Sequence, residues 1–167
     1  MVGSIICGVD ESASARGAAA VARGLSRKLG LRLVFVRVVD EGTSRETLEA
    51  AAESLELLTI DTRDADSSTR WLVETGHPAD RLVAAAEDAD ASMIVVGSHG
   101  PRSSLLGSIS AEVSRRAPCP VVVVPPGAED GLNPGRAARG DRDGRRSGAG
   151  VSNAGGIVRF DLGARQT

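Results

Sequence analysis

Aromatic side chains are almost absent from this 167-residue chain, which holds two phenylalanines, one tryptophan and no tyrosine. Surfaces that stack the bases of single-stranded nucleic acid need more rings than that. A net charge of −2 also gives no general attraction for polyanions, so we expect no nucleic-acid partner. The start, "MVGSIICGVDES", has no basic n-region and only a short apolar run. We therefore expect neither a signal peptide nor a membrane span.

Cysteine is scarce as well. Cys7 and Cys119 lie in the apolar contexts "SIICGV" and "APCPVV", without the spacing of a metal-ligand set. We expect both thiols to act as small buried hydrophobic groups rather than as a disulfide, and we assign no metal site. Reduced cysteines and the lack of a leader favour a cytoplasmic location.

The composition changes near residue 126. Residues 127–167 contain ten of the twenty glycines and seven arginines against five acidic residues, with almost nothing to bury. Such a segment cannot offset its ordering entropy, so we predict a flexible tail at 127–167 and a folded domain at 1–126. Residues 157–161 alternate apolar and polar side chains, which leaves a short added strand open as an alternative.

Within residues 1–126, short apolar runs alternate with helical patterns. We expect strands at 4–9, 31–39, 68–76, 91–97 and 119–125, and helices at 11–30, 44–58, 78–89 and 104–117. Ser12 is the expected N-cap of the first helix and Gly30 its end. This alternation predicts an α/β fold whose parallel sheet is covered on both faces. Ligands of such sheets bind beyond the carboxyl ends of the strands, here at Asp10, 38–40 and 97–100.

The stretch "VVGSHGPRSSLLGSIS", residues 95–110, follows one of these strands. Its glycines allow backbone N–H groups to approach a ligand, and a helix N-terminus behind them adds unpaired donors. The hydroxyls of Ser108 and Ser110 suit phosphate or ribose oxygens. The stretch therefore predicts an anion site, with a tight strand-to-helix turn as the alternative. It contains neither the Lys-Ser/Thr ending of a P-loop nor a G-x-G-x-x-G motif.

Three segments together resemble a universal stress protein domain over residues 3–125. They are "IICGVDESASARGAA", "VETGHPADRLVAAAEDADASMIVVGSHG" and "LLGSISAEVSRRAPCPVVVVP", in this order. The resemblance implies a doubly wound, Rossmann-like sheet of five parallel strands in the order 3-2-1-4-5. It also implies a homodimer formed through the last strand, Val121–Val124.

Members of this family that bind ATP share two glycines separated by two residues, then nine residues, then Gly-Ser or Gly-Thr. Gly97, Gly100 and Gly107-Ser108 match these positions. The resemblance implies that Asp10 and the backbone near Val38 hold the adenine and ribose end of ATP. It places the remaining contacts to ribose and phosphates at Gly97, His99, Gly100, Gly107, Ser108, Ile109 and Ser110.

The spacing departs from that pattern, because only six residues, "PRSSLL", separate Gly100 from Gly107. Three fewer residues remove up to roughly 10 Å of reach from an extended loop, and Pro101 removes one N–H donor. The loop either tightens and keeps the phosphates or folds across the space that they need.

We interpret the chain as a cytoplasmic stress-response regulator that binds ATP with Mg²⁺ and acts as a nucleotide-dependent dimeric switch on an unknown protein partner. The alternative is a nucleotide-free dimeric interaction module, which the short loop favours. We assign no catalytic residue, because the sequence offers no evident metal-binding carboxylate set or positioned nucleophile for phosphoryl transfer. An adenylating or NAD-dependent enzyme is a third class, against which stand the missing "SGGxDS" and G-x-G-x-x-G motifs.

Overall fold

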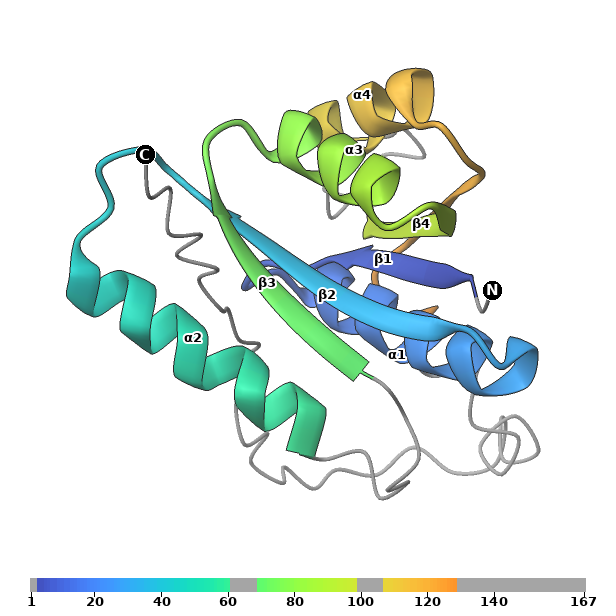
Figure 1. Cartoon of the computed structure of the whole chain (residues 1–167), viewed down its shortest axis with the longest axis horizontal. Helices are drawn as coiled ribbons and strands as arrows, with labels where there is room; N and C mark the ends of the chain where they lie inside the picture. The colour runs from blue at the N-terminus through green and yellow to red at the C-terminus, as the bar shows by residue number, and fades with distance from the viewer. Residues whose placement is uncertain (1–2, 61–68, 99–106, 129–167) are drawn as a thin grey trace, which may run out of the picture.

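The computed structural model describes residues 3–60, 69–98 and 107–128, without the side chains of residues 57–60. Within these described residues, strands and helices alternate as nine elements (Figure 1): β1 Ser4–Gly8, α1 Ala13–Leu29, β2 Arg32–Val39, α2 Arg45–Ile60, β3 Thr69–Thr75, α3 Pro78–Asp88, β4 Ala91–Gly97, α4 Ser108–Arg116 and β5 Val121–Val124. The strands form one parallel sheet in the order β3-β2-β1-β4-β5. The expected doubly wound α/β fold is confirmed.

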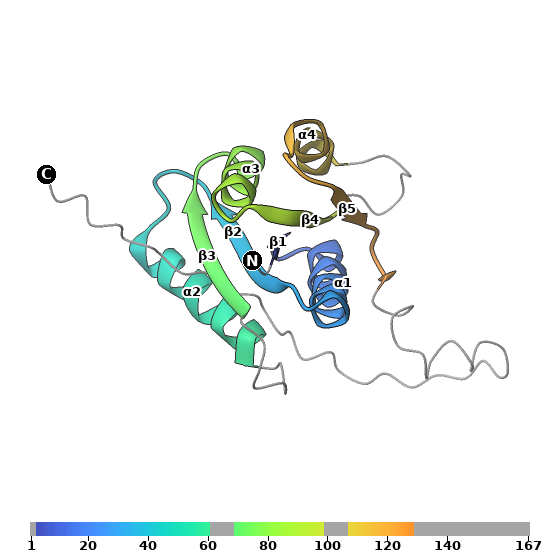
Figure 2. The ribbon, with the colours of Figure 1, turned by 45° about the vertical axis from the view of Figure 1, so that its right-hand side comes forward.

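Helices cover both faces of the sheet, with α1 and α2 on one side and α3 and α4 on the other (Figures 1 and 2). The period of two in the strands explains this arrangement. Ile5 and Phe35 belong to the core shared with α1 and α2, whereas their chain neighbours Ile6 and Val36 belong to the core shared with α3 and α4. All four side chains are at most 1% exposed, so continuous apolar runs are what a sheet buried on both faces requires.

The two ends of α1 follow the predicted capping chemistry. The Ser12 hydroxyl accepts a hydrogen bond from the Ala15 N–H at 3.1 Å, which satisfies one donor of the first turn. Gly30 has a φ of 65° and its N–H donates to the Ser26 carbonyl. This left-handed cap is the conformation that favours glycine.

The predicted helix 104–117 is wrong at Gly107, and its residues 104–106 lie outside the described residues. Helix α4 begins at Ser108, and Gly107 before it has an extended backbone with φ −63° and ψ 161°. The apolar pattern of "SLLGSI" continues across Gly107, but glycine is a poor residue for a helix interior, so the helix starts after it. The consequence is that the first N–H groups of α4 belong to residues 108–110.

Both cysteines are free, as expected, with Cys7 buried and Cys119 half-buried. No helix in the described part of the chain combines the length and the apolar character needed to cross a bilayer. The predicted tail at 127–167 lies outside the described residues except for its first two positions, and so does the alternative strand at 157–161.

Candidate functional site

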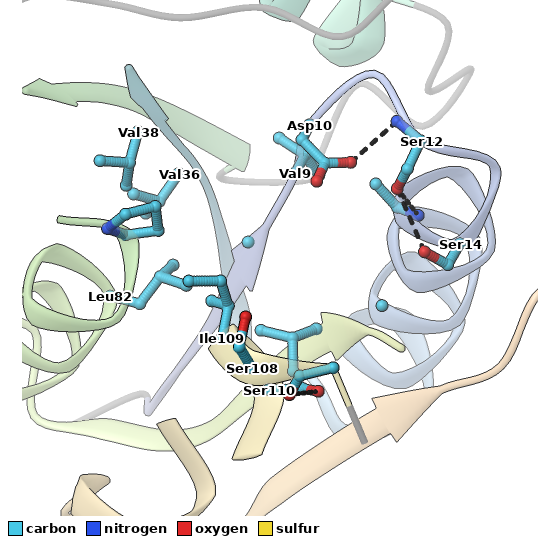
Figure 3. A pocket seen from close by; sticks show the side chains of 16 residues that line it. Val9, Asp10, Ser12, Ser14, Val36, Val38, Leu82, Ser108, Ile109 and Ser110 are labelled. Carbon is cyan, nitrogen blue, oxygen red and sulfur yellow. Dashed lines mark hydrogen bonds between the residues drawn. The ribbon is translucent and has the colours of Figure 1, made fainter. Parts of the chain in front are cut away.

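An open cavity of about 280 Å³ lies at the carboxyl edge of the sheet (Figure 3). Five segments of the described chain contribute to it: the turn from β1 into α1, the carboxyl ends of β2 and β4, and the first turns of α3 and α4. Its described lining residues are Gly8, Val9, Asp10, Ser12, Ser14, Ala15, Val36, Val38, Pro78, Leu82, Val96, Gly97, Gly107, Ser108, Ile109 and Ser110.

One wall of the cavity is apolar. Val36 and Val38 from β2 lie beside Leu82 from α3 (Figure 3), and Pro78 at the first turn of α3 completes this wall. Val36 and Leu82 are nearly buried, whereas Val38 is half-buried. Such a surface accepts a flat apolar body without leaving a polar protein group unpaired.

The wall around the start of α1 is polar. Asp10 Oδ1 accepts a hydrogen bond from the Ser12 N–H at 2.8 Å, and the Ser12 and Ser14 hydroxyl oxygens lie 3.1 Å apart. These bonds fix the turn between β1 and α1, so Asp10 caps the chain locally while its side chain still lines the cavity.

Gly97 closes the cavity where β4 meets α1. A Cβ atom at this position would lie 2.7 Å from the carbonyl carbon of Ser14 and 2.8 Å from its hydroxyl oxygen. Glycine is therefore required here for the close packing of α1 on β4, in addition to the backbone approach to a ligand that we predicted.

The N-terminus of α4 supplies the donors of the cavity. The N–H groups of residues 108–110 have no partner within the helix, since the first helical bond runs from the Ala111 N–H to the Gly107 carbonyl. The aligned peptide dipoles add roughly half a positive charge at this end. The buried Ser110 hydroxyl donates to the Gly107 carbonyl at 3.0 Å, so Ser110 offers a ligand its backbone N–H. Ser108 is exposed, and its hydroxyl can donate a hydrogen bond to a ligand.

The structure brings together most of the residues predicted from sequence. Seven of them line the one cavity: Asp10, Val38, Gly97, Gly107, Ser108, Ile109 and Ser110. His99 and Gly100 lie outside the described residues.

Sequence reasoning missed nine of the described lining residues, which are Gly8, Val9, Ser12, Ser14, Ala15, Val36, Pro78, Leu82 and Val96. Two signals were available. Val36 precedes Val38 by one strand period, and Pro78 and Leu82 are four residues apart on a helix that begins at the same sheet edge.

Comparison with known proteins gives the family. The family model described as the universal stress protein family matches residues 1–125. The chain belongs to this family. It is 32% identical over 142 residues to the universal stress protein in the QAH/OAS sulfhydrylase 3′ region of Thermus aquaticus, which covers 74% of this chain and 99% of that protein.

Solved structures agree with this family assignment. A universal stress protein from Archaeoglobus fulgidus is 25% identical and superposes with a TM-score of 0.64, covering 74% of this chain and 99% of that one. The structure of the universal stress protein from the same organism in complex with dAMP is also 25% identical, with a TM-score of 0.62 and the same coverage.

Proposed function

We propose that this universal stress protein binds an adenine nucleotide, ATP with Mg²⁺, in the cavity at the carboxyl edge of its sheet. The observation that carries the proposal is the N-terminus of α4, which opens into a cavity whose other side is apolar. Free N–H donors and a positive dipole end suit phosphates, and the apolar wall suits a base. The A. fulgidus relative bound to dAMP supports the choice of an adenine nucleotide.

Different parts of the cavity suit the base, the ribose and the phosphates of such a ligand. The base would lie against Val36, Val38 and Leu82, and the ribose hydroxyls would donate to Asp10. The phosphates would then accept hydrogen bonds from the N–H groups of residues 108–110. For His99 and Gly100, which lie outside the described residues, the ribose and phosphate contacts stay a prediction from the family resemblance.

The lining favours holding ATP over cleaving it. Asp10 is the only carboxylate among the described lining residues, and none of them is lysine or arginine. Enzymes of phosphoryl transfer rely on positioned cations around the γ-phosphate. Mg²⁺ would therefore be held by the phosphates and water in the main, and hydrolysis would be slow.

Strand β5 is the proposed dimer interface. Among the described strands it pairs with β4 alone, at the end of the sheet. Its other edge has backbone groups that a second copy of Val121–Val124 can complete around a twofold axis. Helix α4 contacts β5, so a shift of α4 on phosphate binding would be transmitted to the proposed dimer edge. The nucleotide would change the dimer geometry, or the affinity for a protein partner in the cytoplasm, only if it binds two conformations of the dimer with different affinities.

A nucleotide-free dimeric module is the second candidate. The observation that favours it is the six-residue spacing between Gly100 and Gly107, three residues shorter than the ATP-binding pattern.

The test is to denature the purified protein, identify any released nucleotide by mass spectrometry, and titrate the apoprotein with ATP·Mg in a calorimeter. We expect micromolar affinity, about −8 kcal/mol, and at least a tenfold loss in Ser108→Glu, which places a negative charge at the phosphate end. Ser114→Glu on the exposed side of the same helix is the control and should retain affinity. An empty protein that gives no heat at millimolar ATP would establish the nucleotide-free module instead.

A further inference from the structure

Helix α4 is weakly held by apolar contacts. It has nine residues, of which only Ser110 and Val113 are buried. Its N-cap is Gly107, which has no side chain to fix the first turn. The helix packs chiefly on α3 and less on β5. Val113 and the half-buried Ile109 pack in the core shared with α3, so a polar contact between the two helices can add to this modest apolar anchoring.

An ionic cluster joins α4 to α3. The Arg116 Nη1 atom lies 2.5 Å from Asp80 Oδ1 and 2.8 Å from Glu112 Oε1. We call these three residues the Arg116 clamp. The hydrogen bond from Arg116 lowers the pKa of Asp80, and the two carboxylates raise the pKa of Arg116. The side chain of Arg116 thus holds its own helix neighbour, Glu112, and the facing helix α3 together.

His77 lies at the rim of the clamp. Its ring nitrogens are each 3.8 Å from a carboxylate oxygen, Nδ1 from Asp80 and Nε2 from Glu112. A histidine and two carboxylates can together hold a metal ion. Here, however, Arg116 already supplies the positive charge that both carboxylates share, so we assign the cluster to helix pairing.

The clamp joins the two helices, α3 and α4, that contribute the apolar wall and the N–H donors of the cavity. Asp80 lies in the first turn of α3, between the lining residues Pro78 and Leu82. Arg116 is the last residue of α4, whose first residues form the opposite end of the site. At a rise of about 1.5 Å per residue, Arg116 is about 12 Å from Ser108 along the helix. It therefore acts on the site through the helix.

We propose that Arg116 is a positioning residue: by clamping α4 to α3, it holds the N–H groups of residues 108–110 at the cavity and so sets the affinity for a phosphate-bearing ligand. The effect on affinity rests on the proposed function, whereas the positioning of α4 does not.

The experiment compares Arg116→Gln with Arg115→Gln in the full chain. Arg115 is the ideal control, being the exposed neighbour on α4 with no ion pair among the described residues. Hydrogen exchange of residues 111–113, the first amides of α4 that are bonded within the helix, is measured without nucleotide, and ATP·Mg affinity by calorimetry. In Arg116→Gln we expect exchange several-fold faster through local opening and affinity about three- to fivefold weaker, the scale of an exposed ion pair. Arg115→Gln should change neither, and Arg116→Lys should recover part of both.

A double-mutant cycle with Asp80→Asn decides whether the clamp acts as a unit. The double variant should be no weaker in affinity than either single variant, because each removes the same contact. Equal exchange in the Arg116→Gln and Arg115→Gln proteins would overturn the proposal, and so would losses from Asp80→Asn and Arg116→Gln that simply add. Faster exchange in Arg116→Gln, in a protein that does not bind ATP, would confirm the positioning of α4 and refute only the proposed nucleotide function.

Discussion

Replacing Gly97 with alanine tests the close packing of α1 on β4. The added Cβ would lie 2.7, 2.8 and 2.9 Å from the carbonyl carbon, hydroxyl oxygen and Cβ of Ser14. Ordinary contacts of a Cβ begin near 3.4 Å, so α1 must move away from β4 by several tenths of an ångström. A rotamer change of Ser14 cannot relieve the clash, because its backbone is one of the partners. Overpacking of this kind costs about 1–3 kcal/mol.

The assay is urea unfolding followed by fluorescence of Trp71 or by circular dichroism. With a slope of about 1–3 kcal/mol per molar urea, we expect the midpoint to fall by about 1 M. Gly24→Ala is the matched control, because Gly24 lies within α1 and a Cβ there meets nothing within 4 Å. It should raise stability by about 0.5–1 kcal/mol, since alanine is the better helix former. A Gly97→Ala protein as stable as the wild type would refute the packing argument.

Three further predictions concern single residues. Ser12→Ala removes the bond to the Ala15 N–H and should lower the free energy of unfolding by about 1 kcal/mol in the same urea assay; an unchanged midpoint would mean that water replaces the cap without loss. Cys7 is 0% exposed and burial raises the pKa of its thiol to about 12, so a thiol reagent at pH 8 should label at most Cys119 in the native protein and both cysteines in denaturant. Because Arg116 lowers the pKa of Asp80 below its ordinary value of 3.8, the stabilisation from Asp80 is present above that value and is lost as the pH falls through the folded pKa. The stability difference between wild type and Asp80→Asn should therefore shrink as the pH falls below 3.8 and disappear once Asp80 is protonated in the folded state. A difference that does not shrink with falling pH would show that the charge of Asp80 is not its source.

The fold could be predicted because each element carries its own local signal. Apolar runs of strand length, the Ser12 cap and the Gly30 stop are decided within a few residues of sequence, and the structure has them where they were expected. The strand order was implied only by the family resemblance. The edge of the sheet that holds the cavity followed from the general rule for parallel sheets.

The finer geometry of the site depends on contacts between distant residues. Nothing near Gly97 in sequence indicates that Ser14 packs against it, and the pairing of Arg116 with Asp80 spans 36 positions. The start of α4 was misplaced because apolar periodicity and helix propensity disagree at Gly107. The hydrogen bond from the Ser110 hydroxyl to the Gly107 carbonyl depends on the helix beginning at Ser108, so it could not be predicted without that boundary.

The five-segment construction of the cavity links ligand binding to completion of the fold. Residues from 8–15, 36–38, 78–82, 96–97 and 107–110 contribute to its described lining, so a nascent chain or a partly unfolded form that lacks α4 has the apolar wall but not the N–H donors of residues 108–110. Any ligand of the cavity therefore selects the fully assembled domain over every partial one. Each tenfold excess of free ligand over its Kd adds about 1.4 kcal/mol to the stability of that state alone. If the concentration of such a ligand falls in a cell, the protein would lose this stabilisation. It would then unfold and be degraded more readily, although no contact within the fold had changed.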